Sequence, residues 1–152
     1  MDLIIAVDVV LQLISPIYDQ AEKDVLSLVY EKLKPKGYFL LELWDFNNLI
    51  NMIGLANDNV LQLWEEFPPA DPFEYGLFSL KIDSNGYIVW DKIFIKRDNN
   101  EKSIFSNILK PYSKKQIKNI LSEVGYKNVE VFDRWSLFDD GVDGEYIVLV
   151  RK

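Results

Sequence analysis

The stretch DLIIAVD, residues 2–8, decides the fold. Apolar residues occupy both faces of an extended backbone here, a pattern typical of an interior strand of a parallel sheet. From Ala21 to Leu33 the apolar residues recur at helical spacing, and the helix-breaking sequence KPKG follows. Tyr38–Trp44 is a second apolar strand. The sequence thus predicts strand, helix and strand within about 45 residues, a βαβ unit with a right-handed crossover.

The middle of the chain has a different pattern. Helix-like spacing of apolar residues covers 47–67, interrupted near Gly54 and Asn57–Asn59, and a proline-rich loop follows. Leu77–Ile82 and Tyr87–Lys96 flank the turn sequence DSNG, which predicts an antiparallel hairpin. Ser103–Leu109 is a candidate third strand of this antiparallel region.

The last third returns to the α/β pattern. Ser113 and Gln116 have the spacing of a capping box, which predicts that a helix begins there. Val129–Asp133 and Tyr146–Val150 are expected to be strands, separated by a Gly- and Asp-rich loop around Asp139. That loop does not fit the calcium-binding pattern, because a glycine occupies a ligand position, so a solvated turn is expected.

Two residue types are absent, and their absence narrows the chemistry. The 152 residues contain no cysteine and no histidine. This excludes disulfides, thiolate metal sites, cysteine nucleophiles and a Ser-His-Asp triad within the chain, and no metal site is expected. The chain has 17 Lys and Arg against 24 Asp and Glu, a net charge of −7. An acidic balance of this kind argues against a nucleic-acid-binding surface.

The longest apolar stretch, Leu3–Ile14, is interrupted by Asp8 and Gln12. It falls short of the roughly 20 apolar residues that a membrane span requires. It also lacks the basic start and small-residue cleavage site of a signal peptide. We therefore expect no membrane association and a cytoplasmic location.

In their order and separation, these elements resemble the C-terminal half of class I S-adenosylmethionine-dependent methyltransferases, of the small-molecule type with a β-insert. The resemblance covers essentially the whole chain. It implies a partial Rossmann-like α/β sheet with strands equivalent to 4-5-7-6 of the family. The seventh strand, which is the last in the chain, is antiparallel to the others. Asp2–Val7 would be the fourth strand and Tyr38–Leu43 the fifth. Residues 1–152 would then form a single incomplete domain, with an inserted antiparallel hairpin within residues 68–110 as a lid over the substrate.

The resemblance also implies site residues. Asp8 and Glu42 are candidates to orient or deprotonate the methyl acceptor, although each could equally be structural. Trp90 and Arg97, in the insert, could equally be a packed aromatic ring and a solvated charge. The full sets are Val7, Asp8, Val9 and Val10 for the cofactor, and Gln12, Trp44, Trp90 and Arg97 for the substrate.

The chain departs from this family in one large respect. It contains no Gly-rich phosphate or dinucleotide loop, and the acidic residue that holds the cofactor ribose belongs to the half of the fold that the chain lacks. The chain alone is therefore expected to bind S-adenosylmethionine poorly. The edge of the Asp2–Val7 strand carries no Lys or Pro, so it is expected to pair with the missing half, another subunit or a swapped copy.

Two hypotheses follow. The first is methyl transfer from S-adenosylmethionine to a small-molecule acceptor, by a fragment or by one half of a split enzyme. The second is a non-catalytic binding or regulatory module that docks a partner through its open sheet edge. Methyl transfer is an in-line displacement in which positioning dominates, so a carboxylate or a neutral amine could accept the methyl group without a strong base.

Overall fold

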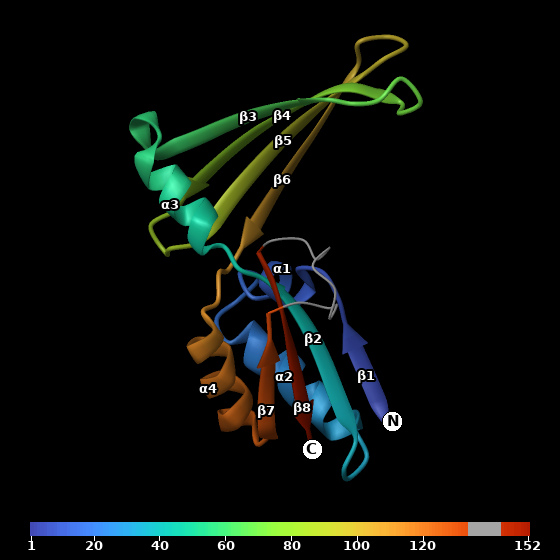
Figure 1. The fold of residues 1–152 in the computed structure, drawn as a ribbon, viewed down its shortest axis with the longest axis vertical. Coiled ribbons are helices and arrows are strands. Elements are labelled where there is room, and N and C mark those ends of the chain that lie inside the picture. Colours follow the sequence, from blue (N-terminus) through green and yellow to red (C-terminus); the bar gives the residue numbers. More distant parts are fainter. Residues whose placement is uncertain (134–143) are drawn as a thin grey trace. The chain divides into compact units, whose positions relative to one another are not determined.

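The computed structural model describes residues 1–133 and 144–152, and the loop expected around Asp139 lies outside these residues. The chain divides into two compact units. Unit 1 comprises Met1–Phe46 and Lys110–Lys152, and unit 2 comprises Asn47–Leu109. Each unit contains one four-stranded sheet (Figure 1).

The sheet of unit 1 is mixed. β1 (Leu3–Ala6) pairs in parallel with β2 (Tyr38–Trp44), and β8 (Glu145–Arg151) pairs antiparallel with β2 on one side and with β7 (Lys127–Phe132) on the other. The strand order is β1-β2-β8-β7. This is the predicted arrangement 4-5-7-6 with the last strand antiparallel, so the predicted α/β fold class is confirmed.

Helices cover one face of this sheet. α1 (Val10–Ile14) follows β1, α2 (Ala21–Lys32) leads to β2, and α4 (Lys114–Val124) precedes β7. α2 and α4 pack against alternate residues of the central strands (Figure 1). The shared core contains Leu26, Leu33, Phe39, Leu41, Leu43, Ile117, Leu121, Tyr146, Val148 and Val150.

The start of α4 is the clearest case of local sequence determining structure. The Ser113 hydroxyl accepts a hydrogen bond from the Gln116 main-chain N–H, and the Gln116 side chain accepts one from the Ser113 N–H. The helix ends at Gly125, which has a φ of 110°. The predicted capping box is therefore confirmed.

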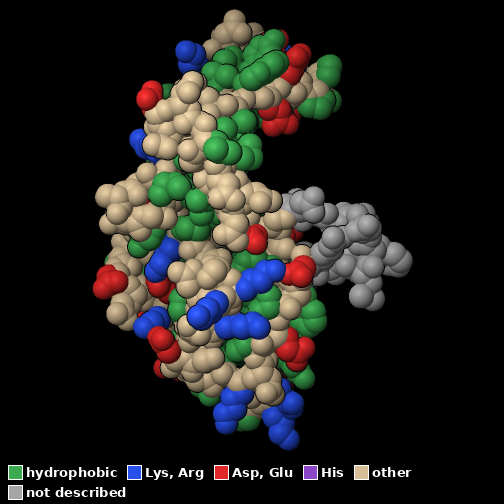
Figure 2. Space-filling model, turned by 60° about the vertical axis from the view of Figure 1, so that its left-hand side comes forward, with side chains coloured by type: hydrophobic (Ala, Val, Ile, Leu, Met, Phe, Trp, Pro, Cys, Tyr) green, Lys and Arg blue, Asp and Glu red, His purple; other side chains and the backbone are tan. Residues whose placement is uncertain are grey.

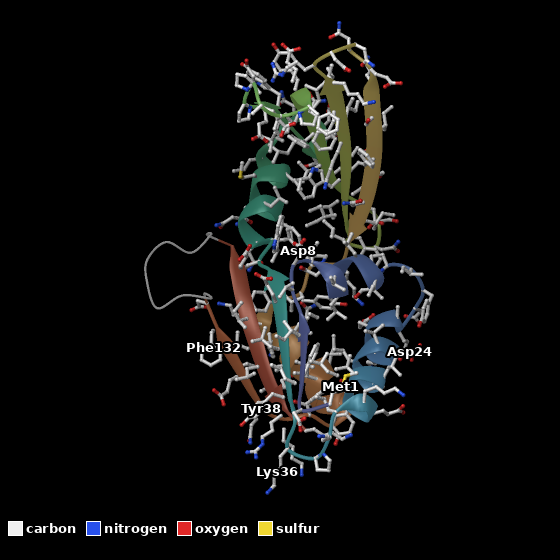
Figure 3. All side chains as sticks on the ribbon, turned by 90° about the vertical axis from the view of Figure 1, so that its right-hand side faces the viewer. Met1, Asp8, Asp24, Lys36, Tyr38 and Phe132 are labelled. Atoms are coloured by element: carbon white, nitrogen blue, oxygen red, sulfur yellow. The ribbon has the colours of Figure 1, made fainter. Side chains whose placement is uncertain are left out.

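The opposite face of the sheet carries exposed apolar side chains in the described part of the chain. Leu3 and Ile5 of β1 are 52% and 55% exposed, and Tyr38 and Phe132 are also exposed. Figure 3 shows Tyr38 and Phe132 on the side of the sheet away from α2, which carries Asp24. Among the described residues β1 pairs only with β2, so its outer edge is open.

Unit 2 consists of one helix and an antiparallel sheet. Its elements are α3 (Asn47–Leu55), a 3₁₀ turn (Asn57–Asn59), β3 (Val60–Glu66), β4 (Phe73–Ile82), β5 (Ile88–Lys96) and β6 (Lys102–Leu109). The strand order is β3-β4-β5-β6. The predicted hairpin and its candidate third strand are present as β4, β5 and β6.

The helical pattern predicted over residues 47–67 is wrong in its second half. Leu61 and Trp64 are three residues apart, which imitates helical spacing. Val60–Glu66 is instead extended and pairs with β4 along its whole length. Backbone pairing with a long neighbouring strand overrides a weak local pattern of this kind. Unit 2 therefore has four strands and begins at Asn47, before the expected insert of residues 68–110.

An aromatic cluster stabilises unit 2. The ring of Phe94 lies between 5.2 and 6.0 Å, centroid to centroid, from those of Phe67, Phe73, Phe78 and Phe105. Such edge and tilted ring contacts add to the free energy of burying the rings. No helix in the described ranges is long and apolar enough to cross a membrane.

Candidate functional site

Two acidic residues meet where the parallel strands β1 and β2 end. Asp8 follows β1, and its backbone N–H donates a 2.6 Å hydrogen bond to Oε2 of Glu42 on β2. The φ of Asp8 is 62°, in the left-handed region that aspartate adopts more readily than most residues. Figure 3 shows Asp8 at the opposite end of the sheet from Met1 and Tyr38. The structure thus brings together the two predicted catalytic candidates.

A third carboxyl group, from Glu145 at the start of β8, completes an acidic cluster. Glu145 pairs in register with Trp44, and the carboxyl groups of Glu42 and Glu145 lie close enough for their charges to interact. We call Asp8, Glu42 and Glu145 the acidic cluster.

The environment of the acidic cluster favours a proton on Glu145. Burial raises the pKa of the Glu145 carboxyl above its ordinary value of 4.5, and the negative charges of Glu42 and Asp8 raise this pKa further. Glu42 itself is only 8% exposed, whereas Asp8 is exposed. The acidic cluster thus brings carboxyl groups, one of them with a raised pKa, to the end of two parallel strands, where α/β folds place their sites.

Glu145 was not among the predicted site residues. Its neighbour in space, Glu42, lies far away along the sequence, and their contact depends on the register between β2 and β8. No local motif marks Glu145. The available signal was a carboxylate directly before the last apolar strand, at the end that would lie beside the end of β2.

Gln12, a predicted substrate residue, lies in the interior of unit 1. Its side-chain amide donates to the Trp44 carbonyl and accepts from the Trp44 N–H, both at 3.0 Å. The main-chain carbonyl of Gln12 accepts a 3.0 Å hydrogen bond from the main-chain N–H of Lys110. Gln12 is 0% exposed. In this structure its amide joins α1 to the end of β2, and contact with a substrate remains a prediction.

The other residues predicted around the end of β1 are accessible. Val7 and Val10 are 47% and 45% exposed, and Val9 is half-buried directly before α1. The ring of Trp44 is half-buried, with its centroid 6.0 Å from that of Phe46. An apolar surface thus borders the acidic cluster, and its contact with the cofactor stays a prediction.

Trp90 and Arg97 belong to unit 2 and have internal contacts there. The ammonium group of Lys92 lies 3.7 Å from the centre of the Trp90 ring. The Arg97 guanidinium donates to the main-chain carbonyls of Phe67, Pro68, Asp71 and Phe73 at 3.0 to 3.4 Å. These bonds hold the loop between β3 and β4, which gives Arg97 a structural task beside its predicted role.

Charged side chains of both signs cover the surface of unit 1. Figure 2 shows Lys and Arg side chains lying among Asp and Glu side chains over this unit. Within residues 1–133 and 144–152, no group of three or more Asp and Glu residues could hold a metal ion.

Solved structures with the same architecture are S-adenosylmethionine-dependent methyltransferases. One from Clostridium acetobutylicum matches 99% of this chain with a TM-score of 0.76 and 16% identity. The CcbJ methyltransferase from Streptomyces caelestis matches with a TM-score of 0.70 and 15% identity. CalS10, an amino pentose methyltransferase from Micromonospora echinaspora, matches with a TM-score of 0.64 and 10% identity.

These likenesses establish the fold. The chain has the architecture of an S-adenosylmethionine-dependent methyltransferase over the part that it spans, which confirms the resemblance noted in the sequence. The chain spans 56 to 58% of the length of these three solved chains. No protein-family model and no curated protein sequence matches it.

Proposed function

We propose that the chain takes part in methyl transfer from S-adenosylmethionine to a small-molecule amine, with the acidic cluster at the acceptor side. The observation that carries the proposal is the position of the acidic cluster at the shared end of β1 and β2, in a methyltransferase fold. Another solved structure with this architecture, KedS8 from a Streptoalloteichus species, is a sugar N-methyltransferase (TM-score 0.58, 11% identity), which supports a nitrogen acceptor.

The acidic cluster suits an amine for electrostatic reasons. Asp8 and Glu42 are carboxylates that can accept hydrogen bonds from an ammonium group. An ammonium nitrogen must lose a proton before it can attack, and a carboxylate of the Glu42–Glu145 pair can take that proton. When bound, S-adenosylmethionine supplies an electrophilic methyl group, whose bond to sulfur breaks as the bond to nitrogen forms, the sulfur keeping the electron pair.

The cofactor side of the proposal rests on Val7, Asp8, Val9 and Val10. They lie at the carboxyl end of β1 and would border the methionine part of the cofactor. The chain contains no Gly-rich loop to hold the rest of the cofactor. We therefore propose that cofactor binding requires a further segment with such a loop, joined to this chain or supplied by a second one.

The open edge of β1 and the uncovered face of its sheet support this requirement. Leu3 and Ile5 are more than half exposed on that face, although a sheet in an α/β protein is normally covered on both sides. A segment that adds a strand beside β1 and a helix over this face would bury both. Residues 68–110, all of which except Lys110 belong to unit 2, would serve as the cover over the acceptor.

The decisive experiment begins with the DNA that precedes the Met1 codon. A frame encoding strand, G-x-G and helix, fused or adjacent, would be co-expressed with this chain, and transfer of labelled methyl groups to a panel of small amines would be measured. Glu42→Gln and Glu145→Gln are each expected to lower kcat by about 100-fold or more. Glu130→Gln, an exposed acidic residue on β7, is the matched control and should leave kcat unchanged.

The alternative, a non-catalytic docking module, predicts a different result. The assembled pair would then form a stable complex but show no heat of S-adenosylmethionine binding in calorimetry and no methyl transfer. If transfer occurs and both glutamine variants retain full activity, the chain is part of a methyltransferase but the acidic cluster does not contact the acceptor.

A further inference from the structure

On one face of the sheet in unit 2, four rows of side chains cross all four strands, and the three rows beyond that of Glu66, Tyr75, Ile95 and Lys102 form one surface. Within each row, the register places the residues opposite one another on neighbouring strands. We call this surface the row face. The first row is Trp64, Leu77, Ile93 and Ile104; the middle row is Gln62, Ser79, Asp91 and Ser106; and the third row is Val60, Lys81, Val89 and Ile108.

The row face exposes large apolar side chains. Trp64 is 67% exposed, Ile104 is 70% exposed, and Leu77 and Ile108 are 42% and 45% exposed. A shallow hollow of about 560 Å³ lies on the sheet and is lined mostly by residues of the first two rows. A cluster of exposed apolar side chains on one sheet face is typical of a surface that contacts another protein.

We propose that the row face is a homodimer interface in which two copies pack face to face, with the two-fold axis parallel to the strands and between β4 and β5. Such an axis places β3 opposite β6 of the second copy, and β4 opposite its β5. Two sheets that pack face to face with nearly aligned strands lie about 10 Å apart. In this arrangement each of the three rows lies opposite the same row of the second copy, and the facing side chains are complementary.

The first row shows the fit of the apolar side chains. Trp64 lies opposite Ile104 of the partner subunit, and Leu77 lies opposite Ile93 of the partner subunit. In the third row Val60 lies opposite Ile108 of the partner subunit. The two apolar residues with the largest exposed fractions on the row face, Trp64 and Ile104, therefore cover each other.

The middle row shows the fit of the polar side chains. One carboxylate oxygen of Asp91 accepts a 2.6 Å hydrogen bond from the Ser106 hydroxyl of the same copy. Its other oxygen can accept from Ser79 of the partner subunit, directly opposite. An axis along the rows would instead place Asp91 against Asp91 of the partner subunit, which like-charge repulsion disfavours.

Charge supports contact between copies at this surface. The whole chain carries a net charge of −7, which opposes self-association in general. The three rows contain one lysine, Lys81, and one acidic residue, Asp91, so their charges cancel. The row face is thus a surface where two copies can meet without net repulsion.

The first test measures the mass of the full chain in solution. Sedimentation equilibrium at about 100 μM, well above a micromolar Kd, should give a dimer. Ile104→Asp should give a monomer with an unchanged circular dichroism spectrum. Leu55→Asp, at an 89% exposed position in α3, is the control and should stay dimeric. A monomeric wild-type chain overturns the proposal, and so does a dimer that Ile104→Asp leaves intact.

The second test fixes the orientation of the two copies. The chain has no cysteine, so single introduced cysteines can be cross-linked without background. A short bismaleimide should join Gln62→Cys to Ser106→Cys when the two variants are mixed. Each variant alone should not cross-link, because three strand spacings put about 14 Å of lateral distance between a position and its own copy.

Ser103→Cys supplies the matched control for the cross-link. Ser103 lies on the same strand as Ser106 but on the other face of the sheet. Cross-linking of Gln62→Cys with Ser103→Cys, or of Gln62→Cys with itself, would contradict the arrangement. These tests involve unit 2 only and use no cofactor, so their outcome is independent of the methyl-transfer proposal.

Discussion

The side-chain amide of Gln12 hydrogen-bonds the main chain of Trp44 in the way that a neighbouring strand would. It donates to the Trp44 carbonyl and accepts from the Trp44 N–H, each at 3.0 Å, in a fully buried position. A single side chain thus satisfies both main-chain polar groups of the last residue of β2. Buried main-chain groups that lose their partners are costly, so this contact has a measurable consequence.

Replacing Gln12 with methionine should destabilise unit 1. The methionine fills a similar volume but removes both hydrogen bonds that the Gln12 side chain makes to the Trp44 main chain, which should cost about 2 kcal/mol or more. Urea unfolding of the two chains measures the difference. An unchanged midpoint would show that the contact contributes nothing to stability and would leave substrate contact as the remaining role for Gln12.

The pH dependence of stability should reveal Glu145. Because its pKa is raised in the folded protein, Glu145 favours folding while it is protonated, and this contribution is lost as pH rises through the raised pKa. Glu145→Gln should therefore unfold at a higher temperature than the wild type at about pH 8, and the difference should shrink as the pH falls toward about 5.

The control for this prediction is Glu130→Gln, which removes one negative charge from an exposed position of the same sheet. It separates the local effect of the acidic cluster from the reduction in net charge. A Glu145→Gln variant that is less stable than the wild type at the higher pH would contradict the assigned environment of Glu145.

Arg97 offers a test between a structural and a binding role. Arg97→Lys keeps the charge but cannot donate to four main-chain carbonyls at once, so it should lower the free energy of unfolding by about 1–3 kcal/mol. The neighbouring Lys96 forms an exposed ion pair with Glu101, and Lys96→Ala should lower the free energy of unfolding much less than Arg97→Lys does. Equal, small effects at both positions would argue that Arg97 does not hold the loop.

Two glycines of unit 2 should respond to alanine in opposite directions. A Cβ at Gly76 would lie 2.7 Å from Cζ of Phe78 and 3.0 Å from Cε2 of Phe67, so Gly76→Ala should destabilise by about 1–3 kcal/mol. A Cβ at Gly54, in α3, would have no neighbour within 4 Å, and Gly54→Ala should stabilise by up to about 1 kcal/mol. Urea unfolding compares them, and a stabilising Gly76→Ala would refute the close packing described.

Features encoded by neighbouring residues were predictable from the sequence. The apolar strand at residues 2–8, the helix from Ala21 and the capping box at Ser113 each depend on contacts within a few residues, and each is present. The order of the sheet in unit 1 followed from the resemblance to methyltransferases, because βαβ crossovers have few possible arrangements.

Features that depend on distant pairing were not predictable in the same way. β3 was missed because Leu61 and Trp64 imitate a helix, and only the ladder with β4 makes this segment extended. Glu145 was missed because its contact with Glu42 depends on strand register. The hydrogen bonds of the Gln12 amide to Trp44 were missed for the same reason. Nothing in the sequence signals that a polar side chain near the end of a strand is buried.

The contacts of Gln12 also bear on how the chain tolerates long insertions. Its side chain binds Trp44, shortly before unit 2 begins, and its main-chain carbonyl binds Lys110, directly after unit 2 ends. One residue of α1 therefore hydrogen-bonds the chain both where it leaves unit 1 and where it returns to unit 1. The entropy of closing the intervening loop grows only slowly with its length. Segments of quite different size and sequence can accordingly be accommodated between these two anchored positions, which makes this point in unit 1 a natural site for grafting.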